Sequence, residues 1–176
     1  MKAVYFDMDG TIADLYGVEG WLDSLIAEQT KPYREAKSLV DMRKLSYELN
    51  RLQRAGYHIG IVTWLSKNSS DEYAEKVAWA KRKWLERHLG SVAWNEICIA
   101  RYGTPKNEVV EYPNGVLFDD EERNRKEWML GDGLAFNVNA IIETLKAMVN
   151  FNLWRILVDS AGASHIFIHS FLFSTL

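Results

Sequence analysis

Ala3-Val-Tyr-Phe-Asp-Met-Asp-Gly-Thr11 is the stretch of sequence that decides the fold. Its apolar start predicts a buried strand of a parallel sheet over about residues 2–6. Strands of open α/β sheets present their chemistry at the carboxyl end, where this strand is followed by Asp7 and Asp9. Two carboxylates so close together repel each other, and no basic residue in the stretch neutralises them. The pair therefore indicates a bound cation, or a reaction that uses the charge.

Strand-like and helix-like patterns alternate along the following chain. Further strands are predicted at residues 57–63, 97–100, 116–118 and 134–136, and helices at residues 40–54, 71–88 and 138–149. Trp21, Leu22, Leu25 and Ile26 follow at helical spacing, and Lys31-Pro-Tyr33 is expected to end that helix. The alternation predicts an α/β fold with a three-layer, doubly wound parallel sheet.

Two segments do not fit this regular alternation. Residues 15–40 are too long for a simple connection and predict a small helical cap inserted after the first strand. Residues 1–149 then form the main domain, and residues 150–176 form an apolar, irregular tail of uncertain role. Packing on the sheet, mediation of a homodimer and a non-native extension all stay open for this tail. Its His165 and His169 have the spacing of a metal pair on a helix, but incidental histidines are the preferred interpretation.

Composition narrows the class of protein. The 176 residues fit one domain, and an apolar content of 48% predicts a packed core. The net charge of −3, without a block of like charges, does not indicate a general nucleic-acid-binding surface. The apolar tail is short for a membrane span, so no membrane partner is expected. With Cys98 as the single cysteine and no secretory pattern at the N-terminus, we expect a cytoplasmic protein.

Reactive side chains follow four of the predicted strands. They are, in chain order, Asp7 and Asp9, Thr63, Lys106, and the pair Asp119 and Asp120. The carboxyl ends of parallel strands lie at one edge of the sheet, so these residues can meet although they are far apart in sequence.

This ordered set resembles the motifs of the haloacid dehalogenase (HAD) superfamily of phosphotransferases, over about residues 1–149. Asp7-Met-Asp-Gly-Thr11 matches the first motif, and Leu117-Phe-Asp-Asp120 matches the acidic fourth. Thr63, at the end of Ile61-Val-Thr63, matches the second. Lys106 is the preferred match to the third, with Lys67 as the alternative. The first and fourth motifs are specific together, whereas the second and third gain force from their order and spacing.

The resemblance implies a Rossmann-like HAD core and a Mg²⁺-dependent phosphatase. It makes Asp7 the nucleophile that forms an aspartyl-phosphate and Asp9 the general acid and base. Thr63 and Lys106 would hold the phosphoryl oxygens. The implied oxygen ligands of Mg²⁺ are Asp7, the main-chain carbonyl of Asp9, and the pair Asp119 and Asp120. Which member of that pair touches the metal directly stays open.

The substrate is expected to be a small phosphomonoester. The predicted binding residues are Gly10, Thr11, Tyr16, Trp21, Tyr33 and Trp64. Aromatic side chains over a phosphate site are suited to stack a nucleobase, with ordinary cap packing as the alternative for Trp21 and Tyr33. The compact chain is similar to the 5′(3′)-deoxyribonucleotidase branch and to small bacterial and phage relatives, which implies a nucleoside monophosphate. A phosphatase of nucleic-acid ends or sugar phosphates is one alternative. A catalytically silent binding protein is another, although such a protein has no need of Asp9.

Overall fold

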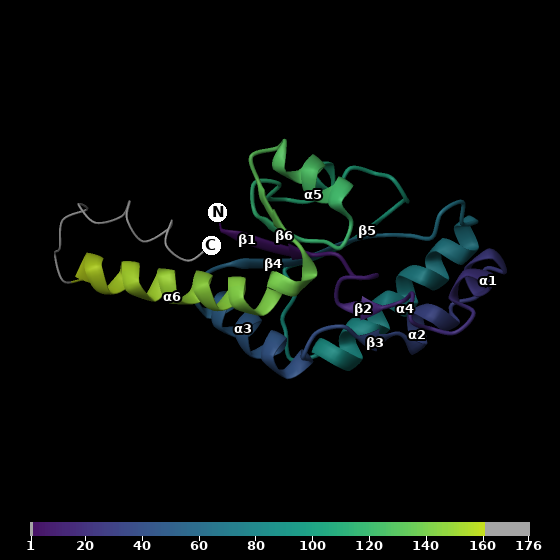
Figure 1. Ribbon diagram of the computed structural model, residues 1–176, viewed down its shortest axis with the longest axis horizontal. Helices are drawn as coiled ribbons and strands as arrows, with labels where there is room; N and C mark the ends of the chain where they lie inside the picture. The colour runs from purple at the N-terminus through teal and green to yellow at the C-terminus, as the bar shows by residue number, and fades with distance from the viewer. Residues whose placement is uncertain (1, 161–176) are drawn as a thin grey trace.

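The computed structural model describes residues 2–160 and is built around one parallel sheet. Its strands are β1 (Ala3–Phe6), β4 (His58–Trp64), β5 (Glu96–Ala100), β6 (Val116–Phe118) and β7 (Leu134–Phe136). They pair in the order β5-β4-β1-β6-β7, and every neighbouring pair is parallel (Figure 1). The predicted doubly wound α/β class is therefore confirmed.

The order of the strands determines where a ligand can bind. The chain adds β4 and β5 on one side of β1, then returns and adds β6 and β7 on the other. The carboxyl end of β1 is thus the switch point, where a crevice opens between the diverging connections. Asp7 follows β1 directly, and its N–H donates to the carbonyl of Phe118 at 2.9 Å. The topology therefore places the first predicted carboxylate in this crevice.

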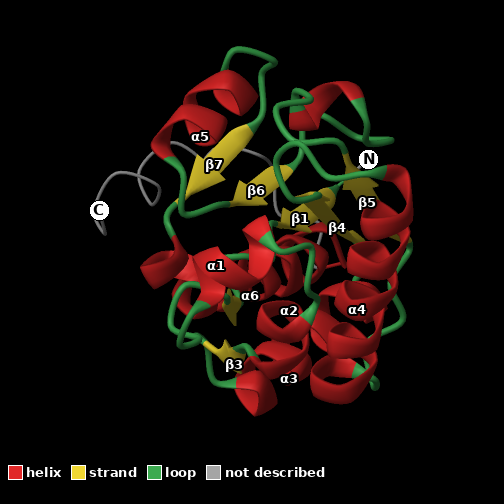
Figure 2. Cartoon of the chain, turned by 90° about the vertical axis from the view of Figure 1, so that its right-hand side faces the viewer, coloured by secondary structure: helices red, strands yellow, loops and turns green. Residues whose placement is uncertain are grey.

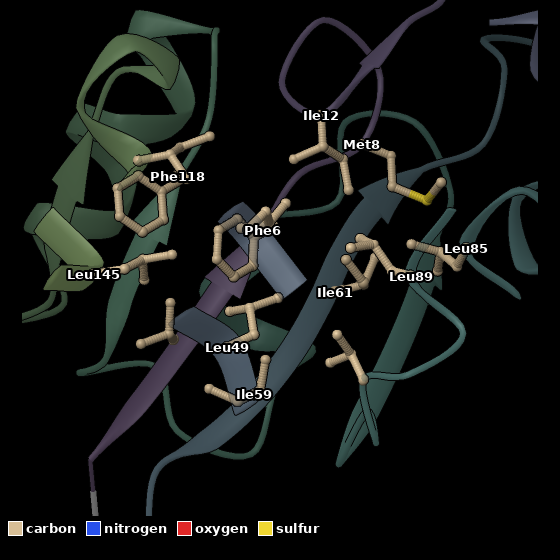
Figure 3. Close-up of a cluster of buried hydrophobic side chains, with 14 of the residues drawn as sticks. Phe6, Met8, Ile12, Leu49, Ile59, Ile61, Leu85, Leu89, Phe118 and Leu145 are labelled. Carbon is tan, nitrogen blue, oxygen red and sulfur yellow. The ribbon is translucent and has the colours of Figure 1, made fainter. Parts of the chain in front are cut away.

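Helices cover both faces of the sheet. On one face lie α3 (Met42–Arg54), α4 (Asp71–Leu89) and α6 (Ile141–Ser160), and on the other lies α5 (Glu122–Met129) (Figure 1). Alternate strand residues point to opposite faces. Phe6 accordingly packs among Ile61, Leu49 and Leu145 (Figure 3), whereas Tyr5 packs edge-on against Trp128 of α5. Two buried layers on one sheet fix the positions of the strand ends.

The segment after β1 forms a small cap on one side of the molecule (Figure 2). It contains β2 (Ala13–Asp14), α1 (Trp21–Ile26), α2 (Lys31–Glu35) and β3 (Lys37–Ser38), with β2 and β3 paired antiparallel. As predicted, α1 does not continue through Lys31-Pro-Tyr33, and this stretch also begins α2, because proline is favourable in the first turn, where its missing N–H is not needed. Tyr33 packs with Tyr73 and Val77 and so joins the cap to α4.

The last helix is longer than the sequence pattern predicted. The expected end at Val149 is wrong, because α6 continues to Ser160, and residues 150–160 contain no glycine or proline that would end it. Residues 161–176, which include His165 and His169, lie outside the described residues. Within residues 2–160, no helix has both the length and the apolar character needed to cross a membrane.

Candidate active site

The strand ends bring the predicted catalytic residues to one cavity of about 480 Å³. Its walls include Asp7, Asp9, Thr63, Lys106, Asp119 and Asp120. These residues come from four different strand ends, spread over more than a hundred positions of the chain. The juxtaposition that the sequence predicted is therefore present, at the switch point of the sheet.

Lys106 joins two of the carboxylates in this cavity. It begins the short 3₁₀ helix η1 (Lys106–Glu108) and is only 4% exposed. Its Nζ donates to Asp7 Oδ1 at 2.7 Å and to Asp119 Oδ2 at 2.6 Å. Burial lowers the pKa of Lys106, but the two carboxylates outweigh burial and raise it overall, which keeps the ammonium charged. The alternative lysine, Lys67, also lines the cavity, with its Nζ 5.8 Å from the ring centroid of Tyr102.

Asp7, Asp119 and Asp120 form a compact acidic cluster, with one carboxylate oxygen of each within 4.8 Å of the others. Burial, followed by the charges of Asp7 and Asp119, raises the pKa of Asp120 to about 6. Excess negative charge on three hard oxygen donors is what a divalent cation such as Mg²⁺ compensates. The carboxylate of Asp9 lies outside this cluster and is bonded to Lys81, so only its main-chain carbonyl is left for the predicted metal role.

Gly10 and Thr11, which were predicted to bind substrate, both lie against Asp120 of the acidic cluster. Thr11 is fully buried, and its hydroxyl donates to Asp120 Oδ1 at 3.2 Å and accepts the Asp120 N–H at 3.1 Å. Gly10 has φ +79°, and a Cβ there would lie 2.4 Å from Asp120 Oδ2, so only glycine fits. The N–H of Gly10 already donates to the carbonyl of Ala13 at 2.8 Å. The Thr11 hydroxyl and the Gly10 N–H thus both have hydrogen-bond partners within the protein.

Lys81 of α4 is a site residue that the sequence pattern did not reveal. It is 1% exposed, and its Nζ donates to Asp9 Oδ2 at 2.6 Å and to Thr63 Oγ1 at 2.8 Å. Burial raises the pKa of Asp9, and the positive charge of Lys81 partly offsets this. A signal for it exists in the sequence, because Lys81 lies four residues after Val77 on the apolar face of the helix. A lysine on such a face needs a buried anion.

Two pairs of aromatic side chains line the cavity together with the carboxylates. Tyr16 and Trp21 of the cap meet edge-on with ring centroids 5.0 Å apart, and Trp64 meets Tyr102 at the same separation. Trp64 is fixed by a hydrogen bond from its Nε1 to a main-chain carbonyl, at 2.8 Å. Tyr33 also lines the cavity but is only 3% exposed, so its ring belongs mainly to the cap core. Tyr102 was not among the predicted binding residues.

The raised pKa of Asp120 predicts pH-dependent stability in the absence of metal. Its folded pKa of about 6 exceeds the ordinary 3.8, so the folded state binds more protons between these values and stability falls as pH rises. In a chelator, we expect a lower urea midpoint at about pH 7 than at about pH 5, and a rise at the higher pH when Mg²⁺ is added. Asp120→Asn should flatten this slope, and an unchanged slope in that variant would contradict the assignment.

Comparisons with known proteins give similarity of structure but not of sequence. No protein-family model and no curated protein matches the chain. The chain is similar to D,D-heptose 1,7-bisphosphate phosphatase from Burkholderia thailandensis, with a TM-score of 0.47 and 16% identity over 76% of this chain and 75% of that one. It is also similar to a HAD family enzyme from Bacteroides thetaiotaomicron, with a TM-score of 0.44 and 12% identity over 78% of this chain and 93% of that one. Because both similarities are distant, function is inferred from the site itself.

Proposed function

We propose that this protein is a Mg²⁺-dependent phosphatase that hydrolyses small phosphomonoesters through an aspartyl-phosphate, with a nucleoside monophosphate as its preferred substrate. The observation that carries the proposal is the placement of Asp7 at the switch point of the sheet, bonded to Lys106 and clustered with Asp119 and Asp120. An attacking carboxylate needs positive charge around it when its substrate is an anion. Lys106 supplies such charge at Asp7, and a cation held by the acidic cluster would add to it.

The proposed reaction has two steps. In the first, a carboxylate oxygen of Asp7 attacks phosphorus, the bond to the leaving oxygen breaks, and Asp9 gives that oxygen a proton. In the second, Asp9 takes a proton from water, the water oxygen attacks phosphorus, and the bond to Asp7 breaks with release of phosphate. Lys106 and the Thr63 hydroxyl hold the phosphoryl oxygens as charge spreads over them. The raised pKa of Asp9 suits its role as a proton donor.

Asp7, Asp119 and Asp120 would hold the cation, together with the main-chain carbonyl of Asp9. When bound, Mg²⁺ neutralises phosphoryl charge and lowers the electrostatic barrier to an anionic nucleophile.

Chelation of Mg²⁺ is therefore expected to stop turnover, and full activity in a chelator would rule out the metal role.

The aromatic walls favour a nucleobase among small substrates. A cavity of about 480 Å³ is much larger than a phosphate group, and its cap side is apolar, with exposed Leu22 and Ile26 beside Trp21. A base stacked on Trp21 or Trp64 would bury an aromatic face, and such stacking contributes roughly 1–3 kcal/mol per base. A simple sugar phosphate would gain little from these walls.

A panel of phosphomonoesters tests this substrate class. Deoxynucleotides and ribonucleotides are expected to exceed sugar phosphates in kcat/KM, and Trp21→Ala should lower the nucleotide values by roughly 5- to 100-fold while changing those of a small aryl phosphate little. Trp79→Ala is the matched control, because Trp79 is 60% exposed on α4 and does not line the cavity. Equal kcat/KM across the panel would remove nucleobase stacking, and inactivity on every phosphomonoester would favour the binding-protein alternative.

A further inference from the structure

Lys81 lies in a buried, apolar part of the protein, where an ammonium group needs anionic or hydrogen-bonding partners. It sits on the inner face of α4, near the fully buried Val77, Trp84 and Leu85, and is itself 1% exposed. Burying an ammonium group without compensating charge and hydrogen bonds is costly. A lysine kept in such a place is held by the groups that it contacts, and these groups are the catalytic ones.

Two buried lysines contact different carboxylates of the site. Lys106 bonds Asp7 and Asp119, whereas Lys81 bonds Asp9 at 2.6 Å. The nucleophile and the proton-transfer group therefore have separate cationic partners, one from the loop after β5 and one from α4. Anchoring of Asp9 Oδ2 by Lys81 leaves Oδ1 for transfer of the proton in the cavity.

The second hydrogen bond of Lys81 determines the orientation of the Thr63 hydroxyl. An ammonium group only donates, so Lys81 occupies an acceptor position of Thr63 Oγ1 at 2.8 Å. The hydroxyl hydrogen is then free to point at a phosphoryl oxygen. On its far side, Nζ lies 5.4 Å from the ring centroid of Tyr33, which connects the lysine to the cap.

We propose that Lys81 is a positioning residue for the phosphoryl-transfer reaction, which fixes Asp9 to protonate the leaving oxygen and turns the Thr63 hydroxyl toward the phosphoryl group. This inference rests on the proposed phosphatase function. Its distinguishing consequence concerns the leaving group, because a poor leaving alcohol needs a well-placed proton donor and a good leaving phenol does not.

The test compares kcat/KM for p-nitrophenyl phosphate with kcat/KM for propyl phosphate. Lys81→Met is expected to lower the propyl phosphate value by roughly 10- to 100-fold and the p-nitrophenyl phosphate value by less than about 5-fold. Lys81→Gln keeps donor hydrogens without the charge, so its kcat/KM for propyl phosphate should lie between the values for wild type and Lys81→Met. Lys83→Met, an exposed lysine on the same helix, should match wild type in both.

Lys81→Met can be combined with Asp9→Asn if Lys81→Met alone does not fold, because the double variant leaves no unpaired charge from this ion pair. Without an acid to position, Asp9→Asn/Lys81→Met should show the same ratio of the two kcat/KM values as Asp9→Asn. A further change in that ratio, or equal losses on both substrates in Lys81→Gln or Lys81→Met, would overturn the positioning role. Inactivity of the wild-type protein on both substrates would instead refute the phosphatase function.

Discussion

Asp7→Asn is expected to abolish the turnover of every phosphomonoester, with a loss in kcat on the order of 10⁴-fold or more. The amide cannot attack phosphorus, and the remaining groups of the site can only bind the substrate. Steady-state assays with enough enzyme to detect slow turnover give the measurement. Asp132→Asn is the matched control, because Asp132 is exposed and does not line the cavity, and its positive φ of 63° tolerates asparagine.

The Asp7→Asn protein should remain folded. Lys106 keeps its 2.6 Å ion pair with Asp119 when the charge of Asp7 is removed, so the buried ammonium is not left without a carboxylate. A thermal midpoint close to that of wild type would therefore accompany the loss of activity. Retained turnover in a folded Asp7→Asn protein would refute the nucleophile.

Lys106→Met should damage both stability and catalysis. Removal of the ammonium leaves Asp7 and the fully buried Asp119 facing each other, and breaking a buried pair in this way costs roughly 3–5 kcal/mol of unfolding free energy. Urea unfolding measures this loss, and Mg²⁺ should recover part of it because a cation at the acidic cluster compensates the same charges.

A surface lysine provides the control for Lys106→Met. Lys126 forms an exposed pair with Glu122 on α5, so Lys126→Met should change the unfolding free energy by less than about 1 kcal/mol. If Lys106→Met has the same unfolding free energy as Lys126→Met, the buried ion pairs of Lys106 do not stabilise the protein.

The features that were predictable from sequence are those with short-range signals. The apolar run before Asp7 and the one before Asp119 each mark a buried strand, and parallel topology then requires their ends to meet. Lys106 was found in a similar way, because it follows the strand β5 in chain order, although the sequence alone left Lys67 as an alternative.

Two of the features that were missed depend on three-dimensional contacts, and a third on a weak local signal. Lys81 lies in the middle of a charged helix, and only the packing of α4 against the strand ends shows that it reaches Asp9. The hydrogen bond from the Thr11 hydroxyl to Asp120 joins residues 109 positions apart, so no local pattern reveals it. The continuation of α6 past Val149 follows from the absence of helix-ending residues, a weaker signal than an apolar stripe.

Trapping of a covalent phosphoryl group tests the central chemistry most directly. Asp9→Asn treated with p-nitrophenyl phosphate and Mg²⁺ should form the aspartyl-phosphate, because the phenol leaves without a proton donor, and should hydrolyse it slowly, because no base activates water. After a rapid acid quench, mass spectrometry of peptides is predicted to find one phosphoryl group per molecule, on Asp7. Release of nitrophenol with the phosphoryl group on another residue, or on none, would contradict Asp7 as the nucleophile.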